Sequence, residues 1–236
     1  MVHNVPMRLV LASASPARLA TLIAAGITPI VQVSTVDEDA ILAALPGGRA
    51  FSGGTTTPAD EVCALAAAKC TDVCEALSTP GTNAELPEGE GVLVVGCDSM
   101  LEIDGHVVGK PINAADASER WRTMSGSTGT LHTGHFLVRT ADGTTAEGVS
   151  SATIRFGSPS QDEIEAYIAS GEPLWCAGAF TIDGLGGAFI EGIDGDPHGV
   201  VGISLPLLRR LLAALGVVWT DLWAPPPATK PVDDAH

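Results

Sequence analysis

The stretch VLVVGCDSMLEIDGHVVGKP, residues 92–111, decides the fold of this 236-residue chain. Its first half, Val92 to Cys97, is a nearly continuous apolar run, which is typical of a strand buried on both faces of a sheet. Asp98 follows this run, so we expect a carboxylate at the end of a buried strand. Asp104 and Gly105 then favour a tight hairpin.

Outward from this stretch, strand and helix patterns alternate. MRLVLA, residues 7–12, predicts another buried strand, and Pro16 suits the first position of a helix that stops at Gly26. Further strands are expected at 30–33, 131–139 and 144–156, a glycine-rich hairpin at 178–193, and helices at 57–77, 113–124, 160–171 and 205–215. Because hairpins interrupt the alternation, we predict an α/β fold with a mixed, twisted central sheet flanked by helices.

The net charge of the chain limits the kinds of molecule that it is expected to bind. The formal net charge is −16, with only 12 Lys and Arg residues. Such an acidic surface argues against binding a nucleic-acid polymer, which requires a basic footprint. It also repels polyphosphates at long range, so a site for one needs a local cluster of basic side chains or a metal ion.

Nothing in the chain is typical of a membrane or secreted protein. No run of about 18 apolar residues is present. Met1 to Ala12 contain Arg8 as the only Lys or Arg and no hydrophobic secretory segment. The five cysteines form no disulfide framework, which indicates reduced thiols. We therefore expect a cytoplasmic protein that makes no membrane contact.

The turn SASP, residues 13–16, is the first candidate site. Ser15 followed by Pro16 is an ordinary helix start. The same turn presents free backbone N–H groups and the positive end of a helix, which together bind anions. Ser13 adds a hydroxyl and Arg18 adds a charge. Both interpretations, a phosphate-facing turn and a simple helix cap, remain open on the residues alone.

Acidic residues give two further candidates. Asp98 could hold Mg²⁺ or orient a water molecule, with Lys110 neutralising phosphate charge. The alternative is a turn-starting Asp and a surface Lys. The cluster Asp37 to Asp39 has the oxygen ligands that Mg²⁺ prefers, but it is also the composition of a solvated acidic turn.

The glycine-rich segment 171–196 lets backbone approach a ligand closely, with Asp183 or Asp194 in reach, although left-handed glycines in a hairpin explain the same pattern. Cys63, Cys70 and Cys74 share one helix face and are interpreted as core residues rather than metal ligands. His132 and His135 are three apart on a strand, so they point to opposite faces and do not form a joint metal pair.

Taken in order, these motifs resemble the Maf family of nucleotide pyrophosphatases. The matching segments are LASASPARLATL, VDED, the Ala68–Lys69 pair, VVGCDSMLEIDGHVVGKP, MSGSTGTLHTG, EIEAYIASGEPLWCAGAFTIDGLGGAFIEGIDGD and VVGISLPLLRRLL. The variant SASPARL and the added tail are most similar to actinobacterial members. The resemblance implies a single α/β domain over residues 1–223, with two lobes around a cleft as in Maf and ITPase folds. Residues 224–236 are expected to be a disordered tail.

The resemblance also implies an activity and roles for individual residues. The implied activity is hydrolysis of a nucleoside triphosphate to the monophosphate and pyrophosphate by a homodimer, with Mg²⁺ or Mn²⁺, and non-standard nucleotides are among the implied substrates. The implied catalytic residues are Asp98 as general base with Glu38, Lys69 and Lys110, and the implied metal ligands are Glu38 and Asp98. The implied substrate-binding residues are Ser13, Ser15, Arg18, Ser99 and Asp183.

Four positions depart from the family pattern associated with dTTP and UTP. Ala17 stands where the family has the first of two arginines, Ser99 replaces a Thr, Cys176 replaces a Lys, and Asp183 replaces a Gln. The run PLWCAG is more similar to the branch associated with 7-methyl-GTP. The preferred base is therefore not predicted.

The sequence leaves two alternative functions to compare with this one. One is a non-catalytic nucleotide-binding regulator of cell division and septum formation, which the presence of Glu38, Lys69, Asp98 and Lys110 disfavours. The other is a Rossmann-type oxidoreductase, which would need a G-x-G-x-x-G motif after the first strand, and none is there.

Overall fold

A computed structural model describes residues 7–79 and 91–224, and it contains one mixed sheet with strand order β2-β1-β3-β5-β6-β7 and with β4 paired to β3. The strands are β1 (Met7–Ala12), β2 (Ile30–Val31), β3 (Gly91–Ile103), β4 (His106–Val108), β5 (Thr128–Arg139), β6 (Thr144–Phe156) and β7 (Ile190–Asp194). β1 pairs in parallel with β2 and β3, and the remaining pairings are antiparallel. The predicted α/β class with a mixed sheet is confirmed.

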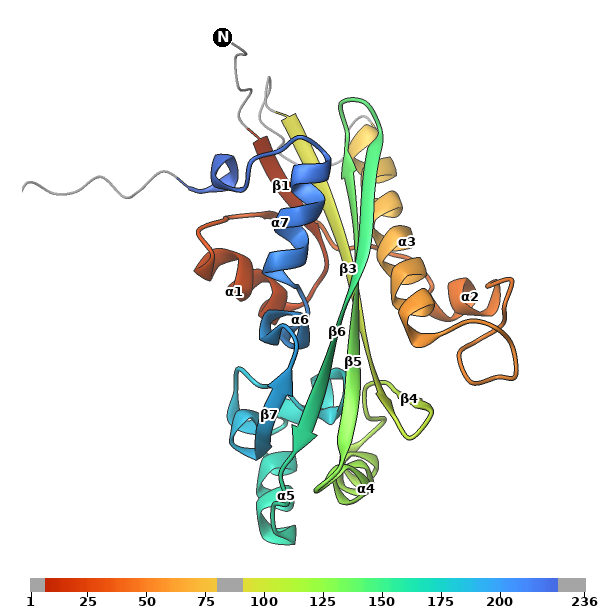
Figure 1. The fold of residues 1–236 in the computed structure, drawn as a ribbon, viewed down its shortest axis with the longest axis vertical. Coiled ribbons are helices and arrows are strands. Elements are labelled where there is room, and N and C mark those ends of the chain that lie inside the picture. The colour runs from red at the N-terminus through yellow and green to blue at the C-terminus, as the bar shows by residue number, and fades with distance from the viewer. Residues whose placement is uncertain (1–6, 80–90, 225–236) are drawn as a thin grey trace, which may run out of the picture.

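The helices cover both faces of this sheet. They are α1 (Pro16–Ala24), α2 (Glu38–Ala43), α3 (Pro58–Ser78), α4 (Ala114–Met124), α5 (Gln161–Ala169), α6 (Pro197–Val201) and α7 (Leu205–Ala214). Four short 3-10 turns complete the described elements: η1 (Glu172–Trp175), η2 (Ala177–Ala179), η3 (Leu185–Phe189) and η4 (Trp219–Leu222). In Figure 1, α1 and α7 lie on one side of the long strands and α3 lies on the other. None of the helices in residues 7–79 and 91–224 is both long and apolar enough to cross a membrane.

Strand β3 has apolar residues on both faces because it is packed from both sides. Leu93, Val95 and Cys97 lie in a core with α1 and α7. Val92 and Val94 point the other way, into a core with α3. The continuous apolar run is explained by this two-sided burial.

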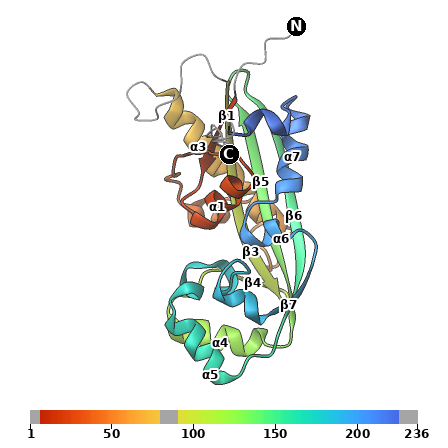
Figure 2. The same cartoon turned by 90° about the vertical axis from the view of Figure 1, so that its left-hand side faces the viewer.

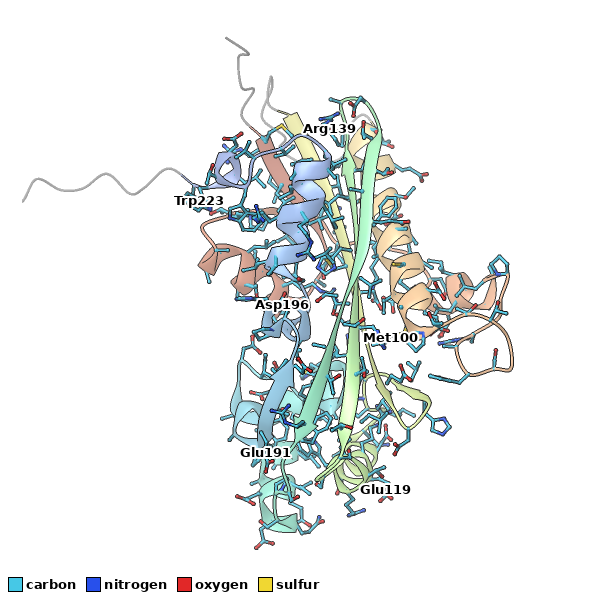
Figure 3. All side chains as sticks on the ribbon, viewed as in Figure 1. Met100, Glu119, Arg139, Glu191, Asp196 and Trp223 are labelled. Atoms are coloured by element: carbon cyan, nitrogen blue, oxygen red, sulfur yellow. The ribbon has the colours of Figure 1, made fainter. Side chains whose placement is uncertain are left out.

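A second core occupies the opposite end of the sheet. It is built around the fully buried Trp121 of α4, whose indole packs edge-on against Phe156, Tyr167 and Phe189. Figure 2 shows α4, α5 and β4 together at this end, away from α1, α3 and α7. Figure 3 places Met100 of β3 near the middle of the molecule, between Arg139 at one end and Glu119 toward the other.

Helix starts follow the predicted caps. The hydroxyl of Ser15 accepts a hydrogen bond from the Arg18 N–H at the start of α1. Complete capping boxes begin α3, through Thr57 and Asp60, and α5, through Ser160 and Glu163.

Several sequence-based boundaries were wrong. β3 does not end before Asp98 but continues to Ile103, because β5 pairs with it from Leu93 to Glu102, well past Gly96, where the pairing with β1 ends. The expected hairpin at 178–193 is instead two short 3-10 turns, η2 and η3, followed by β7, which pairs with β6. β2 spans only Ile30–Val31.

Other expectations have mixed outcomes. The acidic turn Asp37 to Asp39 is the start of α2, with Asp37 as its N-cap. Asp104 and Gly105 do form the predicted tight turn, between β3 and β4. Cys70 is a core residue as predicted, and the five cysteines are free thiols. The tail prediction falls on 224–236, of which 225–236 lie outside the described residues.

Candidate active site

Lys69 joins two carboxylates on the α3 side of the sheet. Its ammonium nitrogen lies 2.6 Å from Oδ1 of Asp98 and 2.6 Å from Oε1 of Glu38. Lys69 and Asp98 are largely buried, whereas the Glu38 side chain is 53% exposed. Three of the predicted site residues therefore meet at a single nitrogen atom.

A close approach of backbone to backbone places this cluster. A Cβ added to Gly96 would lie only 2.1 Å from the carbonyl oxygen of Ala66, so α3 rests directly on β3 at this point. Gly134 of β5 allows the same approach, because its Cβ would meet the Val62 carbonyl at 2.3 Å. Lys69 follows Ala66 by one helical turn and so reaches Asp98, two residues beyond Gly96.

Burial governs the proton affinity of Asp98. Its removal from water raises the pKa of the carboxyl group above the ordinary value, and the charges of Lys69 and Arg18 oppose that rise. The charge of Glu38 acts in the same direction as burial. Asp98 is thus a buried carboxyl group with a raised pKa beside a compensating ammonium.

Arg18 organises a second cluster. Its side chain is 9% exposed and makes three directed hydrogen bonds. Nε donates to the carbonyl oxygen of Gly202 at 2.8 Å, Nη1 donates to Oγ of Ser13 at 2.9 Å, and Nη2 donates to Oγ of Ser99 at 3.1 Å. One guanidinium thus connects α1, the SASP turn, β3 and the residue after α6.

The directions of the hydrogen bonds made by the Ser99 and Thr133 hydroxyl groups follow from their partners. Thr133 Oγ1 lies 2.8 Å from the carbonyl oxygen of Gly199, which can only accept, so Thr133 donates there. Ser99 Oγ lies 2.9 Å from Thr133 Oγ1 and must donate to it. The Ser99 hydroxyl therefore accepts from Arg18 and donates to Thr133, and its hydrogen is already used.

Ser13 is used differently. Its Oγ accepts hydrogen bonds from Arg18 Nη1 and from the Ser15 N–H at 3.2 Å. These two bonds use both lone pairs of the Ser13 oxygen. The hydroxyl hydrogen therefore points away from Arg18 and from the Ser15 N–H. Ser15 serves as the helix cap, as the simple interpretation of the SASP turn predicted. The phosphate-facing interpretation stays a prediction.

Lys110 and Asp183 do not join either cluster. Both are exposed and lie near the half-buried Cys176. Burial, then the charge of Glu172 and then that of Asp183 raise the pKa of the Cys176 thiol, and the charge of Lys110 lowers it. Asp183 also lines a groove shared with α1 and α6, together with Ala20, Thr21, Ala24, Ala25, His198, Val201 and Leu205. Its carboxylate accepts a hydrogen bond from Thr181.

Two residues next to these clusters were missed by sequence reasoning. Thr133 lies opposite Ser99 in the β3–β5 register, but nothing in the spacing of MSGSTGTLHTG singles it out. His135 is fully buried; its Nδ1 donates to the Thr133 carbonyl at 3.1 Å and its Nε2 accepts from the Ser204 N–H at 2.9 Å. It fixes the start of α7.

Glu38 and Asp98, the two predicted metal ligands, lie close together in the structure. Their carboxylates already converge on one ammonium, and carboxylate oxygens are the ligands that Mg²⁺ and Mn²⁺ prefer. Within residues 7–79 and 91–224, no group of three or more His, Cys, Asp or Glu side chains is arranged to hold a metal ion. Any ion at this position needs further ligands from substrate or water.

Comparisons with known proteins give one consistent answer. A nucleoside triphosphate pyrophosphatase of Streptomyces coelicolor is 51% identical over 218 residues, covering 92% of this chain and 95% of that protein. Proteins of the same name from Salinispora tropica and Saccharopolyspora erythraea are 50% and 51% identical, covering 98% and 94% of this chain and 94% and 100% of theirs. The profile of the Maf-like protein family matches residues 8–215, and this chain therefore belongs to that family.

Proposed function

We propose that the chain hydrolyses nucleoside triphosphates to the nucleoside monophosphate and pyrophosphate, with a divalent metal ion as cofactor. The observation that carries the proposal is the convergence of Glu38 and Asp98 on Lys69, each at 2.6 Å. The names of the relatives reported above point to the same reaction.

Asp98 is the proposed general base. It takes a proton from a water molecule whose oxygen attacks the α-phosphorus, the bond from that phosphorus to the bridging oxygen breaks, and pyrophosphate leaves. A pKa raised by burial suits this task, because a base works best when its pKa lies near the working pH. Lys69 holds the carboxylate in place, through its 2.6 Å contact.

The phosphate chain is proposed to lie over the end of β1. Ser13 has a hydroxyl hydrogen to donate there, Ser15 starts the helix whose N–H groups face that end, and Arg18 supplies positive charge. Lys110 is an exposed cation for the leaving group. Ser99 holds Arg18 in place, and Asp183 lines the groove beside α1 and α6.

A divalent ion held by Glu38 and Asp98 would neutralise phosphate charge and polarise the P–O bonds. The carboxylates fit such an ion because they already share one cation. Mg²⁺ and Mn²⁺ both suit these ligands.

The remaining proposals concern organisation. We propose that residues 1–223 act as one domain, since β3 and β5 contribute to both main cores. From the family resemblance we also propose a cytoplasmic homodimer that acts on free nucleotides rather than on a nucleic-acid polymer. The net charge of −16 agrees with the last point.

A pyrophosphate-release screen tests the activity. Purified protein is incubated with ordinary and methylated nucleoside and deoxynucleoside triphosphates, in Mg²⁺, in Mn²⁺ and with a chelator. We expect equal amounts of monophosphate and pyrophosphate from at least one nucleotide, only when metal is present. Tight nucleotide binding without pyrophosphate release would instead support the regulatory alternative.

A further inference from the structure

The carboxylate of Glu172 lies at the start of η3 and accepts two consecutive backbone N–H groups. Oε2 accepts from Leu185 N and Oε1 accepts from Gly186 N, both at 2.9 Å. The cap residue of η3, Gly184, has no side chain to cap this turn. Glu172 therefore performs the capping from a distance of 13 residues along the chain.

Two glycines make this contact possible. A Cβ at Gly184 would lie 2.4 Å from Oε2 of Glu172, and a Cβ at Gly186 would lie 2.3 Å from the hydroxyl of Tyr167. The turn thus rests directly on the carboxylate and on the phenol ring. The hydroxyl oxygen of Tyr167 is buried against this turn, and the two bonds from backbone N–H groups to Glu172 hold the turn in place.

The charge of Glu172 is maintained by the same contacts. Burial acts to raise the pKa of its carboxyl group, but the hydrogen bonds from Leu185 and Gly186 outweigh burial and lower the pKa. Burial, followed by the neighbouring Glu172, raises the pKa of Tyr167. At neutral pH the pair is a carboxylate beside a neutral phenol.

The turn held in this way presents polar and apolar groups outward. Asp183 is exposed at its tip and borders the groove with α1 and α6, and Leu185 is 60% exposed. Gly178 N donates to the Gly109 carbonyl at 3.1 Å, which fixes the neighbouring segment against the loop of Lys110. The segment is therefore rigid at its base and open toward the groove.

We propose that Glu172 is a positioning residue for nucleotide selection: it fixes the turn that carries Asp183, so that this turn contacts the nucleoside part of the substrate. The inference rests on the proposed pyrophosphatase function. Glu172 acts through the turn and does not touch the reacting phosphorus.

The test uses Glu172→Gln in the full-length protein. A Gln offers one acceptor oxygen where the carboxylate offers two, so one of the two N–H groups loses its partner. We expect KM for the best nucleotide to rise about 10-fold with kcat within about 2-fold of wild type. Inhibition by pyrophosphate, which lacks the nucleoside, stays unchanged, and discrimination between bases becomes weaker.

A double-mutant cycle separates positioning from general damage. Asp183→Ala lies at an exposed tip and is expected to fold, and it should reproduce the rise in KM. If Glu172 acts through Asp183, then adding Glu172→Gln to Asp183→Ala has little further effect. Glu165→Gln, on the neighbouring helix α5 where it pairs with Gln161, is the matched control and should change nothing.

Three outcomes overturn the inference. They are an unchanged KM in Asp183→Ala, a parallel rise in the KM and in the pyrophosphate inhibition constant of Glu172→Gln, and full additivity of the two substitutions. Failure of the proposed function itself is recognised separately, because wild-type protein would then release no pyrophosphate from any nucleotide.

Discussion

Asp98 and Ser99 are consecutive residues of β3, yet their side chains take part in clusters on opposite faces of the sheet. Asp98 contacts Lys69 of α3 at 2.6 Å, while Ser99 accepts a hydrogen bond from Arg18 of α1 at 3.1 Å. The alternation of side chains along a strand produces this separation. One dipeptide thus ties the two groups of candidate site residues to each other.

Replacing Asp98 by Asn tests the central assignment. Asn keeps the shape but cannot accept a proton, so we expect turnover to fall by on the order of 10²-fold or more. Pyrophosphate release measures turnover, and circular dichroism confirms folding. Asp162→Asn, at the exposed start of α5, is the control. A folded Asp98→Asn protein with wild-type turnover would contradict the role.

Lys69→Met should affect both catalysis and metal binding. Without the ammonium, Glu38 and Asp98 repel each other, and the melting temperature falls. A divalent cation replaces the lost charge, so Mn²⁺ should raise the melting temperature of the variant more than that of wild type. Calorimetry with and without Mn²⁺ measures this difference. Equal Mn²⁺ effects on both proteins would argue against a shared ion at these carboxylates.

Gly96→Ala should weaken activity without touching a charged residue. Its methyl group would collide with the Ala66 carbonyl, 2.1 Å from the ideal Cβ position, and push α3 away from β3. We expect a loss of about 1–3 kcal/mol in stability and a fall of about 10-fold in kcat as Lys69 leaves Asp98. Gly109→Ala, at a position without a left-handed φ and with nothing within 4 Å of a Cβ, controls for general effects of glycine replacement. Unchanged kcat would show that the contact of α3 with β3 does not set the Lys69–Asp98 distance.

Arg18→Lys should not be tolerated as a conservative change. A lysine has one nitrogen and cannot replace the three bonds to Gly202, Ser13 and Ser99. We expect the free energy of unfolding to fall by about 2 kcal/mol. Chemical denaturation measures it, with Arg209→Lys on the exposed face of α7 as the control. Equal stability of wild type and Arg18→Lys would show that this network contributes little.

His135 should make the free energy of unfolding of the protein fall as the solution becomes acidic. Burial lowers the pKa of this imidazole to about 4 in the folded state, compared with about 6.5 in an unfolded chain. Since the unfolded state binds the proton more tightly, this contribution is complete above about pH 6.5 and is lost as the pH falls toward about 4. The loss is of order 3 kcal/mol at most.

Urea denaturation between these pH values measures the slope. His135→Gln removes the titrating group, so its stability should be lower near neutral pH but should depend less on pH over this interval. His106→Gln, exposed on β4, serves as the control. Parallel slopes for His135→Gln and wild type would contradict the prediction.

The sequence predicted the features that depend on local patterns. Capping residues marked the starts of α1, α3 and α5, and the apolar run marked β3. The end of β3 was not predictable in the same way. It continues past Asp98 because β5 pairs with it, and that pairing is a long-range contact with no local signal.

In the candidate site, too, the residue types could be predicted from the sequence, but their arrangement in space could not. Asp98 and the acidic cluster that contains Glu38 were candidates from their residue types, whereas Lys69 was predicted only through the family resemblance, which placed the three in one set. Their convergence on one atom required the approach of α3 at Gly96, which no spacing in the sequence reveals. Glu172 was overlooked because its partners are backbone N–H groups 13 and 14 residues away.

The shared strands have a mechanical consequence. β3 and β5 contribute Leu93 and Leu137 to the core at one end of the sheet and Leu101 and Leu131 to the core at the other. The two ends are therefore joined by continuous hydrogen-bonded strands and not by a flexible linker. If the ends approach each other around a bound nucleotide, they do so by elastic bending and twisting of the sheet. Bending the sheet in this way costs elastic energy. The sheet would therefore return to its unbent, open shape once the products have left.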